Sequence, residues 1–416
     1  MKKRALVFLF SILPLTAQAA DSAWVQAVSG GFETRLVTSA PVCPMLHTDK
    51  GDMAISMRAA ANANFPLICA AAIPAGAASA SLAGTILPLP VAAPQRILVL
   101  GDTGCRIKGA ALQACNDPAK WPFPQLAAAA AGLRPDLVIH LGDYLYRESP
   151  CPVGDQRCAG SPWGDNWTTW QADFFTPAAP LLAAAPIVLA RGTHEDCLRA
   201  GPGWLRLQGP SAPSEACIPH QRVYTVDLGA LRLAVMDDAS AQETELDREG
   251  APVYAAELTG LAAIPGPVWF VHHRPIWAAV SGPLGIPVGG NLTLIEAARI
   301  AASHGGPLVT PNVELMLSGH IHTFEAINFT KGVPPQIVAG NGGDDLLITP
   351  KNLRGTLFQG HSGVTVADGL SVGGFGFLLM TRAEGGWTVD LYDSAGSKTR
   401  TCRFTEGQPG RLNCPA

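Results

Sequence analysis

Five short apolar runs, each ended at once by polar residues, constrain the fold of this chain more than any other feature. The runs are continuous rather than alternating, which is typical of strands buried on both faces. Helical or irregular stretches separate them, and this alternation indicates an α/β sandwich. In chain order the runs read RILVL, DLVIHL, IVLA, VWFV and VELML.

Polar residues follow every one of these runs. In a sheet of buried strands, functional side chains collect just beyond the carboxyl ends, where the loops converge. A single Asp or His at such a position is most often a helix cap or a surface residue, but five in series indicate a site. The five exits are GDTG (101–104), GDYLY (142–146), RGTHE (191–195), HHRP (272–275) and SGHIH (318–322).

These exits offer carboxylate, phenol, hydroxyl and imidazole groups as donors, and no thiolate. Oxygen and imidazole ligands suit iron, zinc or manganese, and there are too many of them for one tetrahedral ion. The residue types therefore predict a pair of metal ions that share one bridging carboxylate.

The ordered set GDTG, GDYLY, GTHE, VHHRP and GHIH resembles the calcineurin-like metallophosphoesterase superfamily. Most of that superfamily has Asp-x-His in the first motif, whereas this chain has Gly104 at the His position and Tyr146 three residues after Asp143. These two details resemble the purple acid phosphatase branch. The resemblance spans about residues 95–345 and implies two mixed sheets flanked by helices, with a small β domain before them.

The resemblance also implies which residues hold the two ions. For the first ion it gives Asp102, the bridging Asp143, Tyr146 and His322. For the second ion it gives Asp143, Thr193, His273 and His320. Two carboxylates and a phenolate favour Fe(III) at the first position, and Fe(II), Zn or Mn stay open at the second.

One position departs from the family pattern. Where the superfamily has Gly-Asn-His, this chain has Gly192, Thr193 and His194. A threonine hydroxyl is shorter and a poorer neutral donor than an amide oxygen, so we expect Thr193 to weaken the second metal site without abolishing it. At the HHRP exit, His273 is the expected ligand and His272 is the alternative.

Two further residues are candidates for substrate contact. His194 resembles the family's histidine that contacts the phosphate, and we expect it to act as a general acid or to stabilise the transition state. Asn341 lies in the loop GNGGD, which follows another strand exit and could line the pocket or form a plain turn.

The expected function is that of an exported dinuclear phosphatase, which hydrolyses phosphomonoesters by attack of a metal-activated water. Two alternatives stay open: a phosphodiesterase or nucleotide pyrophosphatase on the same metal core, and a non-catalytic phosphate-binding protein weakened at Thr193. The expected partner is a small phosphorylated substrate. A formal net charge of −4 gives no broad basic field for a nucleic acid. No feature of the sequence indicates an oligomeric state.

The N-terminus has the order of a signal peptide. Three basic residues, an apolar run and Ala-Gln-Ala occupy residues 1–20, and the run is too short for a membrane anchor. We therefore expect a secreted or periplasmic protein with no stable membrane association after cleavage. Ten cysteines beyond this segment fall into five neighbouring couples, 43/69, 105/115, 151/158, 197/217 and 402/414, whose pairing as disulfides is the simplest of many connectivities.

The remaining sequence suggests a division into domains. Residues 21–94 alternate short apolar runs with turn residues, as in a small β domain ended by a Pro-rich linker. Residues 95–400 form the expected catalytic domain, which closes with GFGFLLMTR and GGWTVDLYD as an antiparallel pair joined by a glycine turn. Residues 401–416 form a tail that a disulfide would close.

Overall fold

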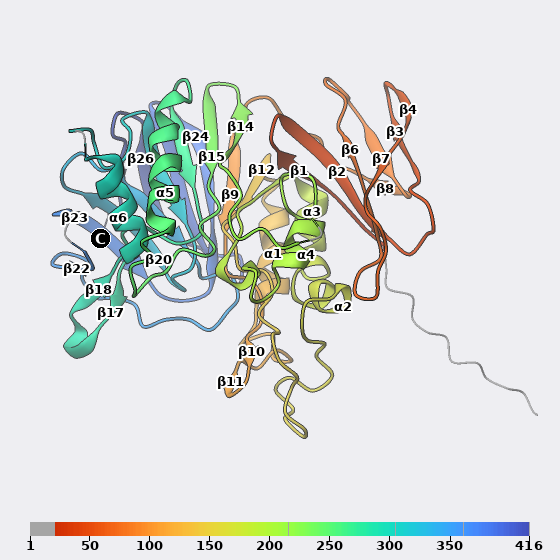
Figure 1. The fold of residues 1–416 in the computed structure, drawn as a ribbon, viewed down its shortest axis with the longest axis horizontal. Helices are drawn as coiled ribbons and strands as arrows, with labels where there is room; N and C mark the ends of the chain where they lie inside the picture. Colours follow the sequence, from red (N-terminus) through yellow and green to blue (C-terminus); the bar gives the residue numbers. More distant parts are fainter. Residues whose placement is uncertain (1–20, 215, 304, 361, 416) are drawn as a thin grey trace, which may run out of the picture.

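The structure is a computed structural model that describes residues 21–214, 216–303, 305–360 and 362–415. The expected signal peptide, residues 1–20, lies outside the described residues. Two large sheets dominate the fold, and helices cover their outer faces (Figure 1).

The larger sheet has 11 strands. The apolar runs that begin at Arg96, Leu137 and Ile187 form its parallel centre, β9, β12 and β13. In pairing order its strands are β27 (Arg411–Asn413), β26 (Lys398–Thr405), β25 (Gly386–Asp393), β24 (Gly376–Ala383), β9 (Arg96–Leu100), β12 (Leu137–His140), β13 (Ile187–Leu189), β1 (Ser22–Val28), β2 (Gly31–Thr38), β6 (Leu67–Ala72) and β5 (Ser56–Ala59).

The second sheet has seven strands. The runs VWFV and VELML form its neighbouring parallel strands β16 and β19. In pairing order its strands are β14 (Tyr224–Leu228), β15 (Leu231–Val235), β16 (Val268–Val271), β19 (Val313–Ser318), β21 (Gln336–Ala339), β20 (Phe324–Phe329) and β23 (Val366–Val372).

Three small sheets complete the strands. They are β4–β3–β7–β8 (Gly51–Ala54, Met45–Thr48, Ala80–Leu82, Thr85–Ile86), β17–β18–β22 (Val280–Ser281, Pro287–Gly289, Leu357–Phe358) and β10–β11 (Ile107–Lys108, Ala111–Leu112). The hairpins β10–β11 and β17–β18 both project at the lower side of the molecule as drawn in Figure 1.

The two large sheets pack face to face around an apolar core. Side chains from both inner faces meet there, among them Val99, Ile139, Trp269 and Leu317, and all four are buried. Helices bury the two outer faces with cores of their own. The helices are α1 (Phe123–Gly132), α2 (Trp167–Trp170), α3 (Ala179–Ala184) and α4 (Gly201–Leu207) beside the larger sheet, and α5 (Gly250–Gly260) and α6 (Leu292–Ala301) on the other; short 3₁₀ and π turns lie at Gln171–Phe175, Thr193–Glu195, Leu261–Ala263 and Pro283–Gly285.

This architecture confirms the predicted α/β sandwich of two mixed sheets flanked by helices. The closing antiparallel pair is also confirmed, because β24 and β25 pair from Gly376 with Asp393 to Ala383 with Gly386. A glycine turn joins them, in which Gly385 has a φ of 66° that few other residues adopt.

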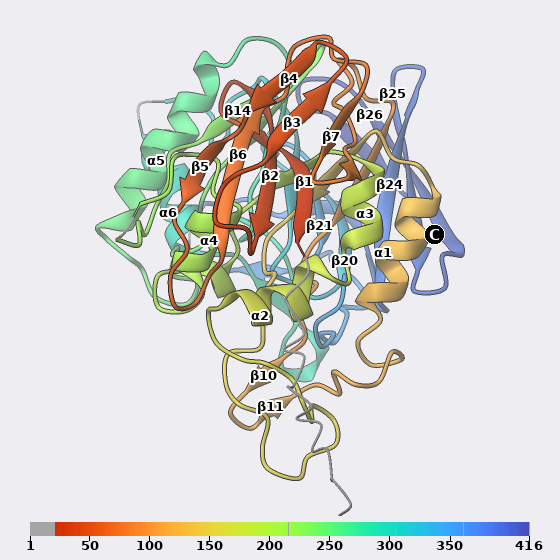
Figure 2. The same ribbon diagram turned by 90° about the vertical axis from the view of Figure 1, so that its right-hand side faces the viewer.

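The N-terminal β region continues the larger sheet. Gln26 of β1 pairs in parallel with Ile187 of β13, so β1, β2, β6 and β5 extend the sheet beyond its parallel centre. Figure 2 shows β1, β2 and β6 side by side. The guanidinium groups of Arg35 and Arg58 donate hydrogen bonds to main-chain carbonyls of 205–211. The division into domains at residue 94 stays a prediction.

The structure contains all five of the simple disulfide pairings. They join Cys43 to Cys69, Cys105 to Cys115, Cys151 to Cys158, Cys197 to Cys217 and Cys402 to Cys414. Five disulfides indicate an oxidising compartment. Among the described residues, no helix has the length and apolar character needed to cross a bilayer.

Candidate metal centre and active site

The five strand exits meet at one place. Asp102 follows β9, Asp143 follows β12, and the 3₁₀ turn Thr193–Glu195 follows β13 in the larger sheet. The histidine exits follow β16 and β19 of the other sheet, so the donors converge where the carboxyl ends of both sheets come together.

One cluster is centred on the phenol of Tyr146. Its Oη atom donates a hydrogen bond to Oδ2 of Asp143 at 2.9 Å and lies 3.2 Å from Oδ1 of Asp102. The Nε2 atom of His322 is 3.2 Å from the same Oη and 3.4 Å from Oδ1 of Asp102. The structure thus brings together all four residues expected at the first metal, and their role as ligands stays a prediction.

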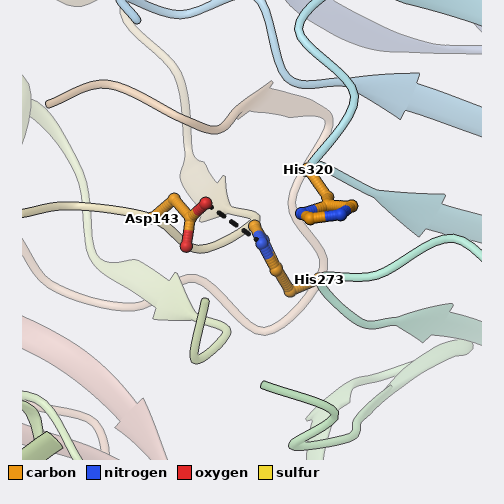
Figure 3. Close-up of side chains that lie close together, drawn as sticks. All are labelled: Asp143, His273 and His320. Atoms are coloured by element: carbon orange, nitrogen blue, oxygen red, sulfur yellow. Dashed lines mark ion pairs between the residues drawn. The ribbon is translucent and has the colours of Figure 1, made fainter. Parts of the chain in front are cut away.

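A second cluster shares Asp143 with the first. One potential ligand atom from each of Asp143, His273 and His320 lies within 4.8 Å of the other two, in an arrangement that could hold a metal ion (Figure 3). The Oδ2 atom of Asp143 is 3.2 Å from Nε2 of His273. The hydroxyl of Thr193 lies 3.5 Å from Nδ1 of His320, which places it beside this cluster.

The backbone at the donors adopts an uncommon conformation. Asp102, Asp143 and His320 have φ values of 58°, 60° and 68°, in the left-handed region. Side chains other than glycine adopt this region at some cost, and such residues gather at functional sites. The hydrogen bond from the backbone N–H of His320 to Oδ2 of Asp102, at 2.9 Å, ties two of these turns together.

Gly104 occupies a position where a side chain does not fit. A Cβ there would lie 2.7 Å from the Tyr146 ring and 2.7 Å from the carbonyl oxygen of Tyr144. The tyrosine therefore fills the space that a histidine at 104 would need. This contact gives a physical reason for the paired departure, Gly104 with Tyr146, seen in the sequence.

The donor sets suit metal ions. The Nε2 atom of His273 is buried, has no hydrogen-bond partner and faces the Asp143 carboxylate that the two clusters share, as expected of a nitrogen that coordinates a cation. Its Nδ1 atom is 2.8 Å from the carbonyl oxygen of Leu141, and Nδ1 of His322 is 2.7 Å from that of Asp345. Carbonyl partners of this kind orient the imidazole so that Nε2 points at the metal.

His273 rather than His272 faces the cluster. The Nδ1 atom of His272 is 3.0 Å from Oδ2 of Asp238, and its ring stacks on Phe270. Asp238 also accepts hydrogen bonds from the backbone N–H groups of His273 and Arg274. The geometry favours His273 as the ligand and gives His272 a supporting position.

The two predicted substrate contacts lie in different surroundings. The His194 ring lies against Tyr146, with centroids 3.7 Å apart, and its backbone N–H donates to Oδ1 of Asp143 at 2.8 Å. The side-chain amide of Asn341 donates a hydrogen bond to the backbone carbonyl oxygen of Gly374 at 2.7 Å. Asn341 is not among the described residues that line the cavity below, so its role stays a prediction.

A cavity of about 630 Å³ opens over both clusters. Asp143, Tyr146, Thr193, His194, His320 and His322 form its floor and wall. Four cationic side chains also line it: Arg106, Lys108, Arg199 and Arg274. The cavity can therefore receive an anionic group directly above the donors.

The model of the calcineurin-like phosphoesterase family matches residues 95–324. This chain belongs to the calcineurin-like phosphoesterase family. The resemblance noted in the sequence is thereby confirmed, and membership of a phosphoesterase family supports a hydrolase. No curated protein matches the sequence.

Solved structures share the fold of this phosphoesterase. Purple acid phosphatase PPD1 from yellow lupin (Lupinus luteus) seeds is 13% identical, with a TM-score of 0.51, over 92% of this chain and 74% of that chain. A structure of PhoD is 11% identical, with a TM-score of 0.52, over 94% of this chain and 91% of that chain. At these identities the likeness concerns the fold alone.

Charges in the phosphoesterase site shift the pKa values of its groups. Burial opposes ionisation of Asp143, but His273 and His194 outweigh it and hold the Asp143 pKa well below its usual range. Burial alone would lower the pKa of His273, yet Asp143 raises it to about 10. Burial and the charges of Asp143 and Asp102 raise the pKa of Tyr146 well above its usual value. A divalent or trivalent cation would stabilise the deprotonated forms of these groups.

Besides Asp173 and Asp238, which accept hydrogen bonds from the backbone of Tyr146 and His273, four acidic residues near the site were not assigned from the sequence. Glu195 accepts hydrogen bonds from the backbone N–H groups of Asp143, Tyr144, Leu145 and Gly192, and it therefore fixes the loop that carries the Asp143 carboxylate. Because Glu195 belongs to the GTHE exit, the sequence alone could have identified it as a residue of the site. The other three are Glu148, Glu243 and Asp344, which pair with His194, His320 and His322 respectively.

Proposed function

We propose that this phosphoesterase is an exported dinuclear metal-dependent phosphatase that hydrolyses phosphomonoesters. One observation carries the proposal: the Tyr146 phenol lies within 3.2 Å of two carboxylates and an imidazole, those of Asp102, Asp143 and His322, and a second cluster shares Asp143. Asp102, Tyr146 and His322 would hold the first ion with Asp143, and Thr193, His273 and His320 would hold the second.

When bound, the two ions would supply an activated water and would offset the charge that develops on the phosphate. The phenolate and two carboxylates support Fe(III) at the first position, and Fe(II), Zn or Mn at the second. The left-handed turns at Asp102, Asp143 and His320 hold the donor atoms in place before substrate arrives, which lowers the cost of reorganisation.

The chain's own residues would bind and orient the ester. Arg106 and Arg274 line the cavity and attract an anionic phosphate, although each is also paired with a carboxylate, Asp344 and Glu243. His194 lies on the Tyr146 ring and lines the cavity, and it would donate a hydrogen bond or a proton to the leaving group. Export is supported by the five disulfides.

The test combines activity with metal content on one sample. Purified protein is assayed with a chromogenic phosphomonoester and the matching diester, and its metals are measured by elemental analysis. The expected result is turnover of the monoester, iron in the protein and a visible absorption band that disappears in Tyr146→Phe. Preference for the diester, or two bound metals without turnover of either ester, would overturn the proposal.

A further inference from the structure

The lining of the cavity combines two unlike chemistries. Beside the four cationic side chains, Val280, Leu347 and Ile348 also face the cavity. Val280 begins the β17–β18 hairpin, whose turn carries Leu284 and Ile286. We call these five residues, Val280, Leu284, Ile286, Leu347 and Ile348, the apolar rim.

The apolar rim starts next to the metal donors. The backbone N–H of Leu347 donates to the carbonyl oxygen of His322 at 3.1 Å, so only one hydrogen bond separates the rim from a donor residue. The backbone N–H of Ser281 donates to the carbonyl oxygen of Ile348 at 3.4 Å, which joins the hairpin to this loop. The parallel pair of β18 with β22 holds the hairpin on its other side.

Four of the five rim side chains are exposed to water, and Val280 is partly buried. Leu284 is 99% exposed and Ile348 is 78% exposed, and Ile286 and Leu347 are 45% and 42% exposed. Isolated exposed apolar residues are ordinary, but Val280, Leu347 and Ile348 line a polar cavity together, and the adjoining hairpin turn carries two more apolar side chains. Such a combination indicates a surface for the apolar part of a ligand. Covering these side chains with an apolar group of a ligand would be favourable.

We propose that the substrates are phosphate esters whose alcohol portion is an extended apolar chain, and that the apolar rim covers this portion. The phosphate would lie over the donors and the cationic side chains, while the chain leaves the cavity between Val280 and Ile348. The inference rests on the function proposed above and specifies its substrate class. Because the cationic side chains and the apolar side chains line the same cavity, the substrate must carry both an anionic phosphate and an apolar chain.

The test uses ethyl, butyl, hexyl and octyl phosphate as soluble monomers, with release of inorganic phosphate as the readout. Full burial of a methylene would raise kcat/KM about fourfold, and for an open rim we expect about twofold per methylene, well over tenfold from ethyl to octyl. In Ile348→Ser, kcat/KM for octyl phosphate should fall about fivefold more than the value for ethyl phosphate. A parallel arm with a phosphatidic acid in vesicles shows whether the tail must be free in solution or is also accepted from a membrane.

A matched control is Ile86→Ser on β8, since Ile86 is 81% exposed and does not line the cavity. It should leave the whole series unchanged. Equal kcat/KM for all four esters would overturn the substrate class and leave the phosphatase function standing. No turnover of any ester would overturn the phosphatase function, and the substrate class with it. The proposal would also be overturned if kcat/KM were equal for all four esters and the wild type were a dimer that Ile348→Ser dissociates. The apolar rim would then be an interface with a second copy of the chain.

Discussion

The Nδ1 atom of His194 lies 2.6 Å from the Oε1 atom of Glu148. The two atoms are within ion-pair distance, although their angle is not that of a hydrogen bond. Lys108 also pairs with Glu148, at 2.9 Å, and Arg199 lies 3.7 Å from it. Burial opposes ionisation of Glu148, but His194 and Lys108 lower its pKa to about 2. Glu148 is therefore an ionised carboxylate in contact with His194, which lines the cavity.

Glu148→Gln should lower kcat on a phosphomonoester by about tenfold to a hundredfold and change KM little, because the amide keeps the shape but removes the negative charge that orients the His194 ring. Steady-state kinetics on the purified variant measures both constants. If Glu148 acts through His194, the double variant with His194→Ala should be no slower than His194→Ala alone. Additive losses would show that Glu148 has an independent role.

Thr193→Asn should strengthen the second metal position, because an amide oxygen reaches further and is a better donor than the threonine hydroxyl. After dialysis against a chelator, elemental analysis should find more metal per chain in this variant than in the wild type, with a turnover that rises in parallel. Thr193→Val is the matched control, since it keeps the shape and removes the oxygen, and its metal content should fall below that of the wild type. Equal metal content in all three proteins would contradict the assignment of Thr193.

Glu195→Ala should disrupt the metal centre without touching a proposed ligand. The substitution leaves backbone N–H groups of Asp143, Tyr144 and Leu145 buried without an acceptor, at about 1 to 3 kcal/mol each. Glu195→Gln keeps one accepting oxygen and should be intermediate. Thermal midpoint and metal content should both rank wild type above Gln and Gln above Ala. Wild-type metal content in the Ala variant would show that the loop holds its shape unaided.

Glu325 on β20 should make the stability of the fold depend on pH. Burial raises its pKa to about 8, from 4.5, although its carboxylate accepts a hydrogen bond from the backbone N–H of Ala279. The unfolded chain therefore releases this proton at lower pH than the folded chain does. The free energy of unfolding falls as pH rises from about 4.5 to about 8, and the loss is complete above that range.

Glu325→Gln removes this titration. The difference in free energy of unfolding, variant minus wild type, should increase in favour of the variant by up to about 4 kcal/mol between about pH 4.5 and pH 8.5. Urea unfolding of both proteins at the two pH values measures it, and the comparison cancels every other titrating group. A difference that is constant with pH would show that Glu325 is ionised in the folded protein throughout.

The sequence predicted the fold and the meeting of the donors because both depend on local patterns. Continuous apolar runs identified β9, β12, β13, β16 and β19, and the exits of these strands identified every residue of the two clusters. The family resemblance then distributed the donors between two ions.

Contacts between segments distant in the chain could not be predicted in this way. Glu243 meets His320 from a loop that carries no recognisable motif, and the Asn341 amide turns to Gly374, 33 residues away. Gln26 pairs with Ile187, which is distant in the sequence, and neither strand contains a periodicity or motif that predicts this pairing. Such contacts depend on the assembled sheets, which the local pattern does not describe.

The parallel pairing of β1 with β13 has a practical consequence for anyone who shortens this chain. Removing residues 21–94 would leave the N–H and C=O groups of β13 open along the boundary of the sheet, a surface that recruits strands from other molecules. A protein truncated to begin at residue 95 should therefore aggregate on expression, whatever the state of its metal donors.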